Sequence, residues 1–199
     1  MTREQWLHKM AQHLAKRFEE INYSLKDTKY RLSCGMPTSS GGAKLKAIGQ
    51  CFSPSVSADH TSEIFISPTI SGSVEVAATL AHELIHAVVG IQHGHKGPFR
   101  KCALALGLTG KMTATVAGDE LTAYIKEEVE IIGEYPHAVL DTSKTKRQKG
   151  RLLKAQCTNK ECWGYSELGR PYSVRISARV FELAAIKCPC CDEDLYINE

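Results

Sequence analysis

Two histidines four residues apart, His82 and His86, constrain the fold of this chain more than any other feature of the sequence. Residues at this spacing on an α-helix lie on one face about one turn apart, so both imidazoles can point at one position. The opposite face of the helix is apolar, which predicts that it packs against the core. Its apolar residues are Leu80, Ala81, Leu84, Ile85 and Val88. The sequence therefore predicts a helix from about Ser73 to Gly90, buried on one side, with two metal-binding groups on the other.

Glu83 directly follows the first histidine and completes a His-Glu-x-x-His pattern. In this pattern the histidines bind zinc and the carboxylate acts as a general base. A catalytic zinc has three protein ligands and a water molecule, whose pKa falls to about 7. Glu83 is the candidate catalytic residue, which takes a proton from this water and delivers it to a leaving amine. The competing interpretation is a chance occurrence on an amphipathic helix, which the apolar back face and the histidines that follow disfavour.

A third ligand has to come from outside the motif. His93 and His95 follow the expected helix end, and a reversal of the chain at Gly90 or Gly94 would bring either of them back to the metal. A carboxylate ligand would come from a later helix, where Glu120 is the candidate. We rank His95 first, His93 second and Glu120 third.

Four cysteines near the end of the sequence predict a second metal site. Cys157 and Cys162 form one pair, and Cys188 and Cys191 form another, with Cys190 able to replace a member of the second pair. Four thiolates complete a tetrahedron and leave no position for water, so this zinc would be structural. Free buried thiols are the alternative, but the paired spacing favours metal. That alternative suits the isolated cysteines, which are Cys34, Cys51 and Cys102.

Helices and strands are both expected, which gives an α+β fold. Thr2 and Gln5 form a capping box at the start of the first helix. The apolar stripe of this helix is Trp6, Met10, Leu14 and Phe18. Asp119 is expected to cap the helix that Gly133 ends, with Leu121, Tyr124, Ile125 and Ile132 facing inward. The remaining expected elements are a helix over 98–107 and strands over 44–52, 63–67 and 172–176.

Three regions follow from these patterns: a first domain over 1–141, a basic linker over 142–154 and a second domain over 155–199. The linker carries six basic residues and no acidic one between Thr142 and Lys154. The opening residues contain no apolar run typical of a secretory signal, and the sequence has no transmembrane run. We therefore expect a cytoplasmic protein with reduced thiols and no membrane partner. Its net charge of +3 is too small to predict a nucleic-acid partner by itself.

The segments His82–Gly90 and Gly94–Phe99 together resemble the SprT-like metalloproteases, the group that includes bacterial and phage SprT proteins and eukaryotic Spartan. The resemblance implies a helical, zincin-like metalloprotease domain with a small β-sheet, followed by a C-terminal zinc ribbon. It also implies that His82, His86 and His95 bind the catalytic zinc and that Glu83 is the general base. Lys96 departs from the usual Gly-His-Gly order of the family.

The same resemblance implies a zinc-dependent endopeptidase that cuts DNA-bound or DNA-crosslinked proteins in a bacterial or phage-infected cytoplasm. The basic linker can follow phosphates, although a flexible tether has the same composition. Aromatic residues of the ribbon can stack on single-stranded bases: Trp163, Tyr165 and Tyr172. We further expect an edge strand near Ile64–Ile66 to pair with the protein substrate. The alternatives are a transcription-associated zinc-ribbon protein with a non-proteolytic site, which an intact Glu83 disfavours, and a hydrolase of small amides.

Overall fold

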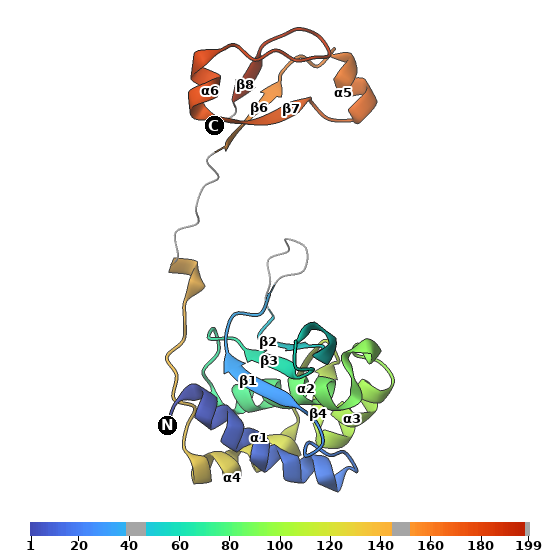
Figure 1. Cartoon of the computed structure of the whole chain (residues 1–199), viewed down its shortest axis with the longest axis vertical. Helices are drawn as coiled ribbons and strands as arrows, with labels where there is room; N and C mark the ends of the chain where they lie inside the picture. The colour runs from blue at the N-terminus through green and yellow to red at the C-terminus, as the bar shows by residue number, and fades with distance from the viewer. Residues whose placement is uncertain (39–46, 145–151, 198–199) are drawn as a thin grey trace. The chain divides into compact units, whose positions relative to one another are not determined.

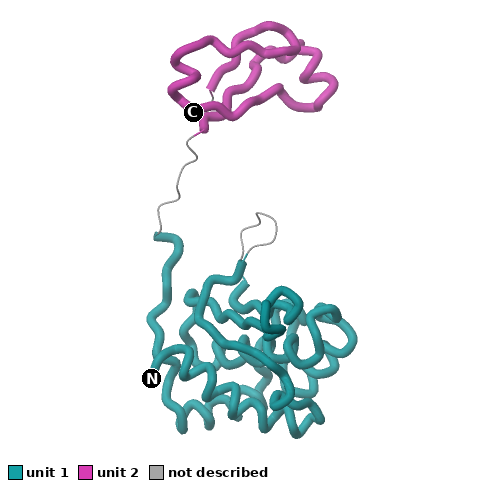
Figure 2. The backbone as a smooth tube through the Cα atoms, viewed as in Figure 1, with its two compact units in different colours: residues 1–144 teal, residues 145–199 magenta. Residues whose placement is uncertain are grey.

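The computed structural model describes residues 1–38, 47–144 and 152–197. The chain divides into two compact units, residues 1–144 and 145–199 (Figure 2). The described residues form six α-helices and three small sheets, which is a mixed α+β architecture (Figure 1). None of the described helices has the length and apolarity needed to span a membrane.

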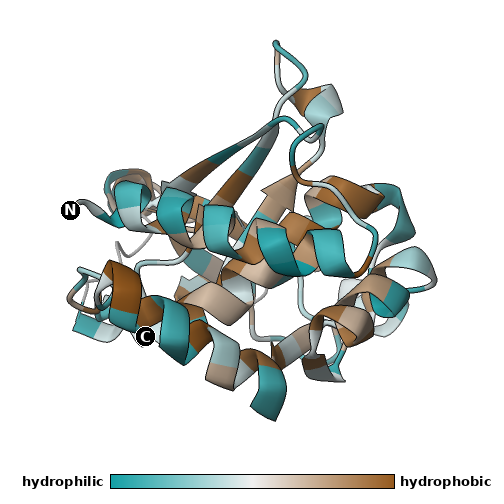
Figure 3. Ribbon diagram, turned by 90° about the horizontal axis from the view of Figure 1, so that it is seen from below, coloured by the Kyte–Doolittle hydropathy of each residue, from teal (hydrophilic) through white to brown (hydrophobic). Residues whose placement is uncertain are grey.

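The first helix, α1 (Arg3–Glu20), begins with the predicted capping box between Thr2 and Gln5. The predicted stripe is fully buried. Two hydrogen bonds join α1 to the chain around α4 (Asp119–Ile132): Trp6 Nε1 donates to the Gly133 carbonyl at 2.7 Å, and the Tyr124 hydroxyl donates to the His13 carbonyl at 2.7 Å. Figure 3 shows that the helices of this unit carry hydrophobic and hydrophilic residues on different faces.

A three-stranded sheet precedes the central helix. Its strands are β1 (Tyr30–Cys34), β2 (Gly49–Phe52) and β3 (Ser62–Ile66), in the order β1-β3-β2. β3 pairs in parallel with β1 and antiparallel with β2. The predicted edge position of Ile64–Ile66 is therefore wrong, since β3 is the middle strand. β2 lies at one edge of this sheet, and residues 44–46 of its predicted range lie outside the described residues.

Helix α2 (Ser73–Val89) lies at the centre of the first unit and contacts β2, β3, α1, α3, α4 and β5. Its predicted back face is confirmed: Leu80, Ala81, Leu84 and Ile85 are fully buried, while Val88 is partly exposed. Gly90 ends the helix with a φ of 91°, a conformation that a residue with a side chain rarely adopts.

Helix α3 (Pro98–Leu106) is followed by a hairpin that the sequence analysis missed, β4 (Leu108–Lys111) and β5 (Ala114–Ala117). The predicted cap of α4 is wrong, because Gly118 occupies the capping position and Asp119 is the first helical residue. The helix begins one residue earlier than predicted, because the Gly118 carbonyl accepts its first bond from the Thr122 N–H at 2.8 Å. A side chain has no room at the cap, since a Cβ at Gly118 would lie 2.9 Å from the Gly107 carbonyl oxygen. Asp119 still places its charge at the favourable end of the helix.

The second unit is built on β6 (Leu152–Cys157), which lies between β7 (Ser173–Ser177) and β8 (Leu195–Ile197). Two short helices, α5 (Trp163–Leu168) and α6 (Ala178–Leu183), complete it. Its buried core is Ala155, Cys157, Cys162, Cys188 and Leu195. Residues 145–151 of the predicted linker lie outside the described residues, and β6 occupies the last three positions of that range. Short 3-10 turns occur at Pro54–Val56, Ile91–His93 and Thr142–Lys144.

The buried face of α2 leads to a stability prediction. Leu84→Ala should lower the free energy of unfolding of the first unit by about 2–5 kcal/mol, because it removes a fully buried side chain from a packed interface. Urea unfolding in a Trp163→Phe background measures this, since Trp6 is then the only tryptophan fluorophore. The matched control is Leu104→Ala on the exposed side of α3, expected to change stability by less than about 0.5 kcal/mol. Equal losses would contradict this packing.

Candidate metal centres

Three histidines of the first unit converge on one position. His82 and His86 lie on α2, and His95 lies in the segment after it. The Nε2 atom of His95 is 3.2 Å from Nε2 of His82 and 3.2 Å from Nε2 of His86. Nitrogen ligands of a tetrahedral zinc lie about 3.3 Å apart, given Zn–N bonds of about 2.0–2.1 Å. The three imidazoles therefore fit a zinc ion, and they leave its fourth position open.

The turn after α2 decides which of the three predicted candidates for the third ligand joins this cluster. Gly90 and Gly94 both have positive φ, and the chain reverses there to bring back His95. His93 is exposed and stays outside the cluster. Glu120 is engaged elsewhere, because its carboxylate accepts a hydrogen bond from the Arg17 guanidinium at 2.7 Å.

Burial keeps all three imidazoles neutral. It is the main cause that lowers the pKa of His82 to about 4 and the pKa of His86 to about 3. The neighbouring histidines add to both shifts by electrostatic repulsion. Burial also lowers the pKa of His95. A neutral imidazole has a free nitrogen lone pair, which is the form that binds a metal.

Two further residues hold the histidines in place. Thr115 on β5 lies with its hydroxyl oxygen 2.8 Å from Nδ1 of His82, a contact that fixes the ring orientation. The fully buried ring of Phe99 packs against all three imidazoles, with centroid distances of 4.3–5.0 Å. His86 Nδ1 is buried without a hydrogen-bond partner among the described residues. The sequence does not predict the contact between Thr115 and His82, because this contact depends on a hairpin that the sequence does not predict.

Glu83 lies against β2, beside the histidine cluster. Burial raises the pKa of its carboxyl group to about 8, and a hydrogen bond from the backbone of Cys51 opposes this rise. Gly49 makes the close approach possible, because a Cβ there would lie 2.6 Å from Glu83 Oε1 and 2.7 Å from Thr79 Cγ2. A buried carboxyl group with a raised pKa is suited to exchange a proton near neutral pH.

The histidines and Glu83 face a cavity of about 490 Å³. Residues 47–51, in and before β2, line one part of it, and residues 113–116, in and before β5, line another. A volume of this size lies within the range of substrate pockets. The cluster can therefore meet a ligand from outside, as a catalytic site requires and a purely structural site does not.

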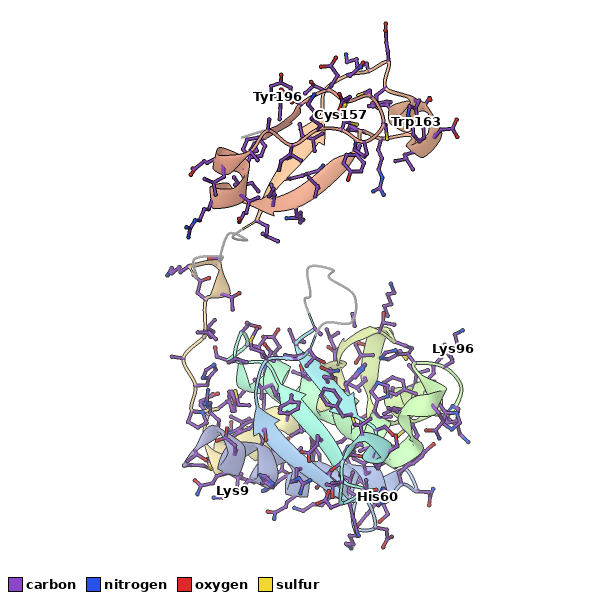
Figure 4. The ribbon with its side chains drawn as sticks, turned by 45° about the horizontal axis from the view of Figure 1, so that its top comes forward. Lys9, His60, Lys96, Cys157, Trp163 and Tyr196 are labelled. Carbon is purple, nitrogen blue, oxygen red and sulfur yellow. The ribbon has the colours of Figure 1, made fainter. Side chains whose placement is uncertain are left out.

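The second cluster consists of the four predicted cysteines of the second unit, Cys157, Cys162, Cys188 and Cys191. Figure 4 labels Cys157. The Sγ atoms of Cys157 and Cys191 are 3.6 Å apart, and those of Cys162 and Cys188 are 3.8 Å apart. Thiolates of a tetrahedral zinc lie about 3.8 Å apart, given Zn–S bonds of about 2.3 Å. These cysteines fit a structural zinc site of the ribbon kind. Cys190 lies outside the cluster and packs against Gly164.

The two clusters are consistent with two zinc ions per chain, and the first gives a sharp ligand test. We expect His95→Ala to remove one of two zinc ions, whereas His93→Ala, a matched change two residues earlier, keeps both. Elemental analysis after mild chelator treatment measures the difference. If only the His93 variant lost zinc, the third ligand would be His93 and not His95.

Comparisons of this chain with protein-family models, with curated proteins and with solved structures find no match. What the two clusters do chemically therefore follows from their own geometry.

Proposed function

We propose that this chain is a zinc-dependent endopeptidase of the SprT-like type that acts on DNA-associated proteins. One observation carries the proposal: a buried carboxyl group, Glu83, lies beside three converging imidazoles at the wall of an open cavity. A structural zinc site needs neither the carboxyl group nor the cavity. Peptide hydrolysis needs both of them, a base for water and space for the substrate.

The residues of the site take distinct roles in this reaction. Bound zinc would polarise the scissile carbonyl group and acidify water. Glu83 accepts the proton of the attacking water and delivers it to the amine that leaves. Thr115 orients His82, and Phe99 shields the imidazoles from solvent. The edge strand β2 runs beside Glu83, where it can pair with the extended backbone of a substrate.

The resemblance of the motif region to SprT-like proteases supports the same reaction. The zinc-binding histidines of that resemblance are His82, His86 and His95, and these are the three that converge. Lys96 departs from the family pattern, but its side chain is exposed (Figure 4). The departure therefore leaves the proposed ligand set unchanged.

Binding of single-stranded DNA is proposed for the second unit. Trp163 and Tyr165 on α5 are 61% and 40% exposed, so their rings are free to stack on bases. Tyr172 is a weaker candidate, because it packs against the core of this unit. Four of the basic residues assigned to the linker lie outside the described residues: Lys146, Arg147, Lys149 and Arg151.

Glu83→Gln should lower proteolysis at least about 100-fold while both zinc ions stay bound, because an amide cannot accept the proton and is not a ligand. Cleavage of casein, with and without single-stranded DNA, measures activity, and elemental analysis measures zinc. Glu127→Gln, an exposed change on α4, is the control and should retain activity. Full activity in the Glu83 variant would remove the proposed mechanism.

Trp163→Ala should weaken the affinity of the full chain for an oligothymidylate by about 5-fold to 100-fold, the range expected for loss of one stacked base. Fluorescence anisotropy measures this affinity. Leu183→Ala is the control, since it removes another exposed large apolar side chain, 76% accessible, from α6 of the same unit. Equal affinities of the wild type and the Trp163 variant would count against stacking on α5.

A further inference from the structure

A second cavity adjoins the one at the histidine cluster. It has a volume of about 1010 Å³ and lies among the first half of α2, β5 and α4. The two cavities share four lining residues, so they are direct neighbours: Ile48, Thr79, Thr115 and Val116. An extended polypeptide bound at the histidine cluster can therefore reach into the second cavity.

Apolar side chains form much of the wall of this second cavity. They are Ile48, Val74, Ala78, Val116, Ala117 and Val129. Val116 stands out, because it is 59% exposed and is shared by both cavities. An exposed β-branched side chain at this junction offers a surface against which the aliphatic part of a ligand can pack.

The charged residues that line the cavity are mostly acidic. Glu75, Glu130 and Glu134 face one basic residue, Lys126, so the lining carries two more negative than positive charges. Within the described residues, no ion pair engages Glu75 or Glu130. Glu134 accepts a hydrogen bond from the Ser73 hydroxyl at the start of α2. Protein carboxylates therefore already balance the positive end of the α2 dipole, so this end of the helix does not make the cavity a site for anions.

We propose that the second cavity is a specificity pocket for a lysine or arginine side chain of the polypeptide cut at the histidine cluster. These two side chains combine a long aliphatic stem with a cationic end, which matches an apolar wall next to unpaired carboxylates. The inference rests on the proposed peptidase function and extends it to the class of substrate. Proteins that bind DNA are rich in lysine and arginine, since these residues neutralise phosphates. The pocket therefore selects the kind of segment that such proteins expose.

Peptide binding to the full, zinc-loaded chain carrying Glu83→Gln tests this pocket without requiring hydrolysis. The probes are two sets of fluorescent ten-residue peptides that differ only in lysine or methionine at one position, scanned along the peptide. We expect lysine to bind about fivefold to tenfold more tightly than methionine at one position, and the preference to shrink at high salt. Adding Glu75→Gln and Glu130→Gln should abolish the preference for lysine and leave the affinity for methionine peptides unchanged. Both residues are exposed, so their replacement does not disturb the core.

Adding Glu127→Gln instead is the matched control, because this carboxylate lies on α4 outside the cavity lining. Equal binding of lysine and methionine peptides at every position would overturn the pocket, and so would a preference that survives the double replacement. Cleavage of the same peptides by the chain with Glu83 intact is the separate measure of the proposed peptidase function. A peptidase without lysine preference would refute only the pocket. Lysine-selective binding without cleavage would support the pocket and count against the peptidase.

Discussion

The packing of α2 is the constraint on which the rest of the first unit depends. Leu84 and Ile85 fix the helix in the core, and the same turns carry His82, Glu83 and His86. A shift of one residue along this helix would turn each ligand by about 100°. The packing of α2 therefore fixes the positions of the His82 and His86 imidazoles. Because α2 also contacts β2 and β5, it holds the two strands that flank the cavity.

The two metal clusters relate to folding in opposite ways. In the second unit three of the five core residues are cysteines of the candidate metal cluster, so a zinc bound there would couple metal binding to folding. The first unit buries a large core of apolar side chains, and Phe99 of this core packs against all three imidazoles. This core does not consist of metal ligands, so folding of the first unit should depend less on metal than folding of the second unit. Removal of zinc should affect these two units differently for this reason.

The sequence predicted the features that depend on interactions between residues close to each other in the chain. The capping box at Thr2, the buried face of α2 and the helix ends at Gly107 and Gly133 depend on residues a few positions apart. Strand order depends on residues far apart in the sequence. The prediction of an edge strand at Ile64–Ile66 was therefore wrong, since β3 lies between β1 and β2. The β4–β5 hairpin was missed because its short strands carry little apolar alternation. The cap of α4 has no side chain because Gly118 lies against Gly107, a residue eleven positions away.

The surroundings of Glu83 could not be predicted from the sequence either, because they consist of contacts between residues far apart in the chain. The carboxyl group is in place because Gly49 has no side chain, and its pKa reflects burial together with a hydrogen bond from the Cys51 backbone. Both residues belong to β2, the edge strand that we propose to pair with substrate. Binding of an extended chain to this strand would exclude water from the carboxyl group and fix the backbone that contacts it. In the proposed reaction, substrate pairing and proton transfer would be coupled, because one strand would form both the binding edge and the support of the base.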